Sequence, residues 1–165
     1  NARRMAQKNF SLDVRPEEEL ANLKNESFDI ITMWHVLEHV PNLKGRVQEL
    51  KRLLKPKGVI IIAVPNCNSL DAKWYKEYWA AYDVPRHLYH FTHDDIEKLF
   101  KQFDLKVFNI LPMIFDSFYV SMLSEKYKNE KVSLIRSMWN GLRSNLNGMR
   151  TGKEYSSEIY LIKKN

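Results

Sequence analysis

The chain has 165 residues, of which 44% are hydrophobic and 28% charged, and only one, Cys67, is a cysteine. This composition predicts one globular domain with a hydrophobic core and argues against disorder. A single cysteine excludes a disulfide framework and a multi-cysteine zinc site. The longest apolar run, residues 59–64, is too short to cross a bilayer. No signal-peptide pattern opens the chain, so we expect a cytoplasmic protein.

The formal net charge is +6, and the excess lies in the last third of the chain. Residues 117–165 contain nine basic and four acidic side chains, whereas residues 1–116 are nearly balanced. This local charge bears on partners more than on fold. The five glycines are about 3% of the chain, roughly half the usual share. No two of them form a G-x-G pair, so the sequence lacks a glycine-rich phosphate loop.

The first third of the chain alternates short strand and helix signals. Residues 1–8 predict the end of a helix, residues 10–14 a short strand, and residues 16–20 a proline-led helical turn. The β-branched run at 28–33 is apolar on both faces, which predicts a buried parallel strand. Residues 43–54 repeat apolar residues at helical spacing and carry basic residues at their end, which predicts a helix.

A second strand follows this helix. Residues 56–58, Pro-Lys-Gly, are expected to stop the helix, and residues 59–64 predict another fully buried strand. Strand, helix and strand together predict a βαβ unit with a right-handed crossover. Residues 67–90 form an aromatic-rich loop or helical excursion.

The rest of the chain continues the α/β pattern. Thr92, with Asp95 three residues later, predicts the capped start of a helix. Residues 105–111 predict a strand, and residues 116–149 two amphipathic helices. The final strand, 157–163, is expected to run antiparallel because no helix separates it from the end of the chain. The expected fold is a Rossmann-like α/β open sheet, mostly parallel, with an antiparallel C-terminal strand.

One short sequence motif matches a known metal-binding pattern. His35-Val-Leu-Glu38-His39 matches the H-x-x-E-H pattern of inverted zinc hydrolases, which places two histidines one helical turn apart. Pro41 limits any helix here to about one turn, and no third ligand stands out, so we expect no metal. A zinc hydrolase remains an alternative, as do partly buried structural histidines. The string follows a buried strand, where α/β sheets place their ligands.

Three segments carry a family resemblance. Residues 28–41 (FDIITMWHVLEHVP) and 50–66 (LKRLLKPKGVIIIAVPN) resemble the second half of a class I S-adenosylmethionine-dependent methyltransferase. They are most similar to the branch that includes the quinone-biosynthesis O-methyltransferases. Residues 83–92 (DVPRHLYHFT) resemble a segment of many bacterial members of that branch. The similarity covers about residues 1–111 and again 157–163.

The resemblance implies S-adenosylmethionine as the cofactor and assigns residues to it. In the family, the end of the strand at 28–33 and the next residues line the cofactor pocket, which implies Met33, Trp34 and His35. An acidic stretch that includes Glu18 falls where relatives carry residues beside the adenine.

The acceptor side is assigned in the same way. The resemblance places His39 near the methyl donor, and Arg86 on the substrate side, where we also expect Trp79 and Tyr82. Methyl transfer needs a positioned nucleophile, and a histidine suits removal of a hydroxyl proton near neutral pH. His39 and His87 are the candidate catalytic residues, and a structural role for each stays open.

The chain departs from the family pattern at its start. Family members open with a strand, a glycine-rich turn, a helix and a second strand that ends in a ribose-binding acid. The resemblance therefore implies one partial methyltransferase domain over 1–165, with inserts at 67–90 and 112–152 that cover the substrate side. Cofactor binding is expected to be incomplete in such a fragment, and an intact protein that has lost cofactor binding is the alternative. An unpaired edge at 28–33 predicts self-association.

The segment 132–147 is a second candidate site. Its apolar residues form one helical stripe, which predicts a helix packed on the sheet, a lid over a hydrophobic acceptor, a membrane-surface helix or an RNA contact. No RNA-binding motif supports a nucleic-acid partner. We expect an enzyme with a small-molecule or lipid-like acceptor. The alternative is a non-catalytic interaction protein on the same fold. The stripe consists of Leu134, Ile135, Met138, Trp139, Leu142 and Leu146.

Overall fold

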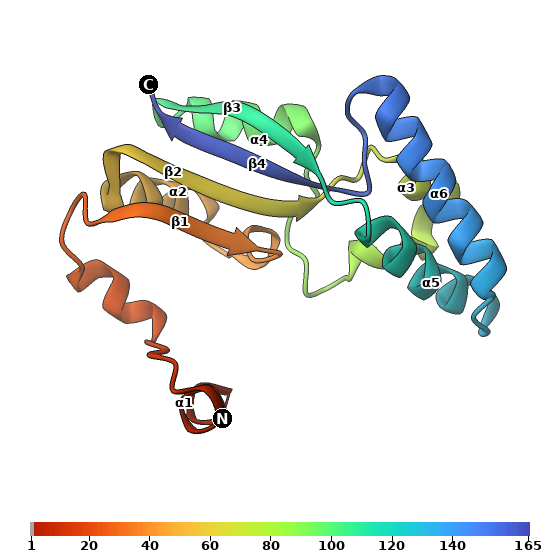
Figure 1. Ribbon diagram of the computed structural model, residues 1–165, viewed down its shortest axis with the longest axis horizontal. Coiled ribbons are helices and arrows are strands. Elements are labelled where there is room, and N and C mark those ends of the chain that lie inside the picture. Colours follow the sequence, from red (N-terminus) through yellow and green to blue (C-terminus); the bar gives the residue numbers. More distant parts are fainter. Residues whose placement is uncertain (1) are drawn as a thin grey trace.

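The computed structural model describes residues 2–165. A four-stranded sheet forms one part of the molecule, and a group of helices lies beyond one end of it (Figure 1). The strands are β1 (Phe28–Trp34), β2 (Leu54–Pro65), β3 (Leu105–Pro112) and β4 (Ser157–Lys164). The α-helices are α1 (Ala2–Phe10), α2 (Leu43–Leu53), α3 (Leu70–Tyr75), α4 (His93–Lys101), α5 (Asp116–Asn129) and α6 (Leu134–Thr151). Four 3₁₀ turns complete the fold: η1 (Glu17–Asn22), η2 (Leu37–His39), η3 (Lys76–Tyr78) and η4 (Ala80–Tyr82).

The sheet has the strand order β1-β2-β4-β3. β1 and β2 are parallel and joined through α2, and β4 runs antiparallel to both of its neighbours, β2 and β3. The expected βαβ unit, the mostly parallel sheet and the antiparallel last strand are therefore confirmed. The fold is an α/β, Rossmann-like open sheet.

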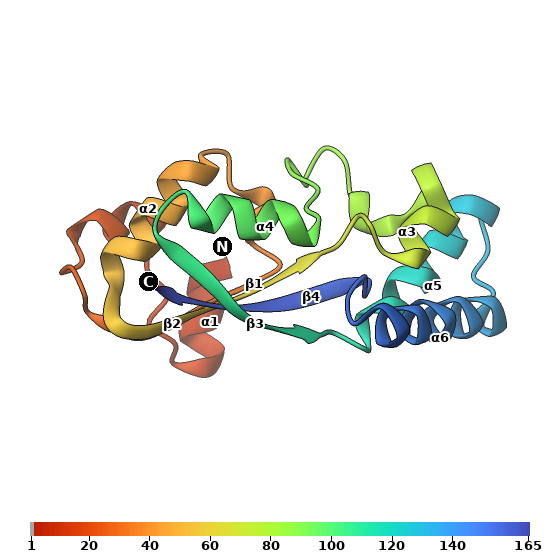
Figure 2. The same cartoon turned by 90° about the horizontal axis from the view of Figure 1, so that it is seen from above.

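One face of the sheet carries the main hydrophobic core. α2 and α4 lie on this face (Figure 2), and α4 begins at the expected capping box of Thr92 and Asp95. Burial of large aliphatic and aromatic side chains between these layers is the chief stabilising term for this half of the molecule. The core includes Leu37, Val47, Leu50, Ile60, Ile62, Ile96, Phe100, Tyr160 and Ile162.

Two strand predictions were wrong in detail. Residues 10–14 form no strand: Phe10 ends α1, and Ser11 takes a left-handed φ of 54° that breaks any extended run. β2 starts at Leu54 and not at residue 59, because residues 56–58 continue into the strand through a bulge opposite β1. Gly58 allows this close approach, since a Cβ there would lie 2.9 Å from the carbonyl oxygen of Asp29.

The expected burial of β1 was also wrong. β1 lies at the edge of the sheet, and most of its side chains are exposed, Ile30 by 60% and Trp34 by 50%. A strand is buried on both faces only when both faces and both edges are covered. Among residues 2–165, β1 pairs with β2 alone.

The helical group packs by a different rule. α6 contacts α5 and α3, so the expected packing of its apolar stripe on the sheet is wrong. The buried face of α6 consists of small and polar residues: Ser137, Gly141, Ser144, Asn145 and Gly148. The carboxylate of Asp71 in α3 holds the group together, because it accepts hydrogen bonds from Trp79 Nε1, Ser144 Oγ and Ser156 Oγ.

Candidate functional site

The site begins where β1 ends. His35 follows the strand with a left-handed φ of 50°, and its amide donates a hydrogen bond to the Ala63 carbonyl at 2.9 Å. This turn directs the chain into η2, which presents Glu38 and His39 at the carboxyl end of the sheet. Only a single 3₁₀ turn forms here, so the helix that the H-x-x-E-H zinc motif requires is absent from this segment.

A loop from far along the chain closes over this turn. The amides of Leu88 and Tyr89 both donate to the carbonyl oxygen of Glu38, at 2.8 and 3.3 Å. The imidazole Nδ1 of His39 donates to the Arg86 carbonyl at 2.9 Å. These bonds explain how the segment 83–92 joins the site, since each fixes the loop backbone against η2.

The two candidate catalytic histidines meet in this arrangement. The rings of His39 and His87 lie 4.6 Å apart, centroid to centroid, in an edge-to-face geometry. His87 Nδ1 donates to the Ala81 carbonyl at 2.7 Å. Because a carbonyl oxygen only accepts, both rings carry their hydrogen on Nδ1 and keep the Nε2 lone pair when neutral.

Glu38 is the most unusual group of the site. Its side chain is 1% exposed, and its Oε1 lies 3.4 Å from His35 Nδ1 and 3.9 Å from His87 Nε2. Asp116 at the start of α5 approaches the other nitrogen of His35 at 3.5 Å. The Glu38 carboxylate chiefly, and the Asp116 charge after it, raise the pKa of His35 against the opposing effect of burial.

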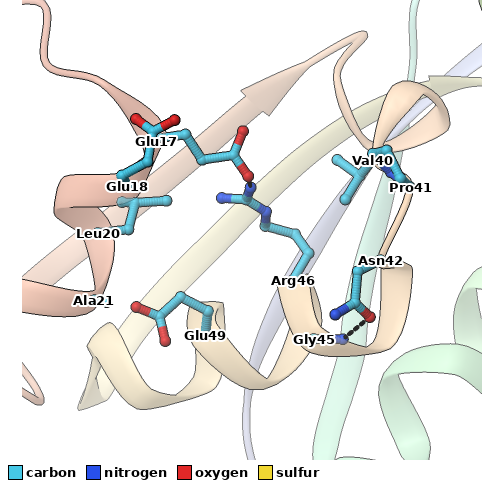
Figure 3. A pocket seen from close by; sticks show the side chains of 10 residues that line it. All are labelled: Glu17, Glu18, Leu20, Ala21, Val40, Pro41, Asn42, Gly45, Arg46 and Glu49. Atoms are coloured by element: carbon cyan, nitrogen blue, oxygen red, sulfur yellow. Dashed lines mark hydrogen bonds and ion pairs between the residues drawn. The ribbon is translucent and has the colours of Figure 1, made fainter.

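A groove runs from η1 to the start of α2, with a volume of about 540 Å³ (Figure 3). Glu18 lines it together with the apolar side chains of Leu20 and Val40. Glu17 forms an ion pair with Arg46 across the groove. An adjoining pocket of about 410 Å³ shares several of these residues and reaches His39 and Val36.

The structure places the other expected cofactor residues as follows. Met33 is buried in the hydrophobic core and is 8% exposed, whereas Trp34 presents half of its surface. His35 lies between Glu38 and Asp116. Met33, Trp34 and His35 follow one another, but only Trp34 is freely accessible.

The expected substrate residues lie on the loop and its base. Arg86 is exposed and forms an ion pair with Asp83 at 2.6 Å. Tyr82 packs edge-to-face against Trp79 and against His90. Trp79 is 2% exposed, and its indole N–H bonds to a carboxylate, so it supports the helical group in this conformation.

Sequence reasoning missed two carboxylates. Glu38 enters the sequence analysis only as part of the H-x-x-E-H string, although a glutamate between His35 and His39 directly after a strand is a visible signal. Asp116 had no such signal, because it reaches His35 from a helix that begins far along the chain. Neither residue was assigned to the methyl-transfer site.

The chain is similar to known proteins in both sequence and structure. Residues 2–110 match a family model described as a methyltransferase domain. The ubiquinone biosynthesis O-methyltransferase of Glaesserella parasuis is 51% identical over 41 residues, which are 25% of this chain and 17% of that protein. The chain thus spans a small part of the length of this curated relative.

Solved structures show the same fold. An S-adenosylmethionine-dependent methyltransferase of Thermotoga maritima superposes with a TM-score of 0.57 at 16% identity, over 87% of this chain and 59% of that one. The [4+2]-cyclase SpnF superposes with a TM-score of 0.53 at 11% identity, over 86% and 51%. The fold therefore serves more than one chemistry, and the family assignment rests on the sequence match. Because that match covers more than half of the residues, the chain belongs to the methyltransferase domain family, in the class I S-adenosylmethionine-dependent group.

Proposed function

We propose that this protein transfers a methyl group from S-adenosylmethionine to a hydroxyl oxygen of a small-molecule or lipid-like acceptor. The observation that carries the proposal is the meeting of His39 and His87 at the carboxyl end of β1, in a chain of this family. The printed name of the Glaesserella relative, an O-methyltransferase, supports oxygen as the methylated atom.

The reaction requires an acceptor oxygen held in line with the methyl carbon and a base that removes its proton. A bond forms between the acceptor oxygen and the methyl carbon while the carbon–sulfur bond breaks, and the sulfonium becomes a neutral thioether. The hydroxyl proton leaves to an imidazole Nε2, for which His39 and His87 are the candidates because their Nδ1 atoms are engaged. Arg86 and Tyr82 on the loop contact the acceptor in this proposal.

The residues present fit part of the cofactor. The groove beside η1 offers the carboxylate of Glu18 and an apolar wall, which suit the amino group and the rings of an adenosine. Trp34, the last residue of β1, and His35, the next residue, lie at the same end of the strand as the histidine site. We propose that binding by residues 2–165 alone is weak, because the sequence has no G-x-G turn for the methionine end.

Two measurements test this function. Formation of S-adenosylhomocysteine with a panel of hydroxylated acceptors should fall about 100-fold or more in His87→Gln. His90→Gln is the matched control, because His90 lies on the same loop with its Nε2 bonded to the Tyr82 carbonyl, and it should keep its activity. His39→Gln tests the other candidate base in the same way, and wild-type activity in both His39→Gln and His87→Gln would refute the proposal. Calorimetry with the cofactor measures binding separately, and tight binding would contradict the expected weakness.

The lipid-like acceptor is supported by α6. Its apolar residues face outward, with Ile135 85%, Trp139 59% and Met149 69% exposed. Exposed apolar stripes of this size mark an interaction surface. None of the helices within 2–165 is long and apolar enough to span a membrane. We propose that α6 lies on a membrane surface, where a lipid-like acceptor would be presented.

Charge on α6 points to an anionic lipid surface. Arg136, Arg143 and Arg150 recur every seventh residue and therefore line one side of the stripe, and α6 contains no acidic residue. A pocket of about 380 Å³ beside Arg136 and Arg143 is lined by Trp74, Lys128 and one acidic residue, Glu125. The Arg143 guanidinium lies 5.1 Å from the Trp74 ring centroid. Basic side chains beside an apolar face are typical of helices that bind anionic headgroups.

Co-sedimentation with vesicles tests this surface. The protein should bind vesicles that contain phosphatidylglycerol more strongly than pure phosphatidylcholine, and Ile135→Ser/Trp139→Ser should lose most of the binding. Phe108→Ser is the matched control, because Phe108 is an exposed apolar residue on β3, and it should bind like the wild type. Unchanged binding by the double variant, or no binding by the wild type, would refute the membrane proposal.

The edge position of β1 supports a separate proposal about partners. Backbone groups on the free side of an edge strand recruit other strands, and Phe28 and Ile30 add exposed apolar surface. We expect the purified 165-residue chain to self-associate. Light scattering that shows a monodisperse monomer at micromolar concentration would contradict this expectation.

A further inference from the structure

Three potential metal ligands converge beside β1. Glu38 and His39 come from η2 and His87 from the loop that closes over it, and one ligand atom of each lies within 4.8 Å of the other two. A single turn and one loop thus bring together two imidazoles and a carboxylate from positions nearly fifty residues apart in the chain.

The carboxylate of Glu38 is buried without a hydrogen bond to stabilise its charge. Its side chain is 1% exposed, yet neither carboxylate oxygen has a hydrogen bond. A buried carboxylate without a partner is costly, so such groups are paired with a cation or bind a metal. His35 Nδ1 at 3.4 Å is an ion-pair neighbour of Glu38 Oε1, but neither it nor His87 Nε2 at 3.9 Å makes a hydrogen bond to the carboxylate, so both oxygens keep lone pairs for a metal ion.

Both histidines are oriented as metal ligands are. His39 Nδ1 is bound to the Arg86 carbonyl and His87 Nδ1 to the Ala81 carbonyl, which leaves each Nε2 lone pair free. A hydrogen bond from the second ring nitrogen to a carbonyl is the usual device that fixes a ligating histidine. Asp83 Oδ2 lies a further 3.9 Å from His87 Nε2 and adds negative charge to the site.

We propose that Glu38, His39 and His87 bind one divalent transition-metal ion, of the zinc, iron or manganese kind. Two imidazoles and one carboxylate are a common protein ligand set for these ions and leave coordination positions open. Ligand atoms stand about 2.0–2.2 Å from zinc, so the three side chains close by roughly 1 Å around the ion. This set differs from the H-x-x-E-H string, because His87 replaces His35, and it revises our expectation that the chain holds no metal.

The use of the ion rests on the proposed function. An acceptor hydroxyl bound to the metal loses its proton to water more readily, because the ion lowers the pKa of a bound hydroxyl. The oxygen then attacks the methyl carbon as the carbon–sulfur bond breaks. With the ion bound, the Nε2 atoms of His39 and His87 hold the metal, so the metal-bound hydroxyl and water replace the imidazole base that these rings supply in the metal-free site.

Direct metal binding tests the site. The full chain, stripped with a chelator, is titrated with Zn²⁺ by calorimetry and with Co²⁺ by its visible absorption. We expect one ion per chain, with affinity lowered tenfold or more in Glu38→Gln and in His87→Ala. His90→Ala is the matched control, since its ring centroid lies 6.5 Å from that of His87 and its Nε2 is occupied, and it should bind like the wild type.

Clear outcomes would overturn the proposal. No saturable binding by the wild type, or equal binding by Glu38→Gln and the wild type, would refute the metal site, provided that circular dichroism shows a folded variant. Binding that follows the expected pattern while Zn²⁺ or Mn²⁺ leaves S-adenosylhomocysteine formation unchanged would refute the use of the ion in transfer. Failure of methyl transfer alone leaves the binding result intact, so the two proposals fail separately.

Discussion

The sheet half of the molecule and the helical half are packed differently, although each has a buried apolar cluster. Between the sheet and α2 and α4, large side chains such as Ile62 and Phe100 are fully buried. In the group of α3, α5 and α6 (Figure 1), serines, glycines and carboxylates occupy many buried positions. Ile135 of α6, in contrast, is 85% exposed. Hydrophobic burial holds the first half, whereas the second combines a smaller apolar cluster around Tyr75, Trp79 and Val120 with buried hydrogen bonds and close backbone approach.

This difference separates two tasks. The sheet presents the histidine site at the ends of its strands, which requires a rigid core. In the helical group, α6 exposes its apolar stripe beside a row of arginines and buries its small and polar residues. Because α6 buries its small residues and exposes its apolar ones, its apolar stripe is available for the proposed contact with a membrane surface.

The largest effect should come from the core of the sheet. Ile62→Ala should lower the free energy of unfolding by about 2–5 kcal/mol, because it leaves a cavity between β2 and the helices. Ile135→Ala removes the same atoms from α6 and should change it by less than about 0.5 kcal/mol. Urea denaturation followed by circular dichroism measures both. Equal losses would show that Ile135 is packed in solution and would contradict the difference between the sheet core and the exposed face of α6.

Asp71→Ala tests the polar interior of the helical group. It removes the acceptor for Trp79, Ser144 and Ser156, and we expect a loss of about 3 kcal/mol. Asp94→Ala, which removes an exposed carboxylate from α4, is the control and should have a small effect. If both variants unfold alike, hydrogen bonds do not hold this half together.

Gly141→Ala tests the close approach of α5 and α6. A Cβ at this position would lie 2.5 Å from Phe118 Cδ1 and 3.0 Å from its Cα, so the helices must move apart. Overpacking of this kind costs about 1–3 kcal/mol. Asn147→Ala on the same helix should cost less. A neutral or stabilising Gly141→Ala in thermal unfolding would contradict the described packing.

Tyr75→Phe gives the smallest effect and a pH dependence. Tyr75 donates to Glu125 Oε1 at 3.1 Å and accepts from Asn140 Nδ2, and burial raises the pKa of the phenol to about 12. A raised pKa adds stability that is complete below the ordinary value of 10.0 and is lost as the pH rises through about 12. The wild type should exceed Tyr75→Phe in melting temperature, by a hydrogen bond worth about 1 kcal/mol, only below pH 10. A difference that does not change with pH would contradict this linkage.

Local signals in the sequence were sufficient for most elements. The βαβ unit, the capping box of Thr92 and Asp95, and the pair of helices before the last strand follow from periodicity and capping, which act within a few residues. The position of His35 and His39 after a strand also predicted that they lie at the carboxyl end of β1, where α/β sheets commonly bind ligands.

Contacts between distant segments were decided only by the tertiary structure. Periodicity shows that Leu134, Met138 and Leu142 share a face of α6, but it does not show whether that face meets the sheet, and the opposite face packs closer because it is small. In the same way, the sequence names Glu38 and His87 separately. They meet because the loop amides bond to the backbone of Glu38, and hydrogen bonds between such distant residues leave no periodic mark in the chain.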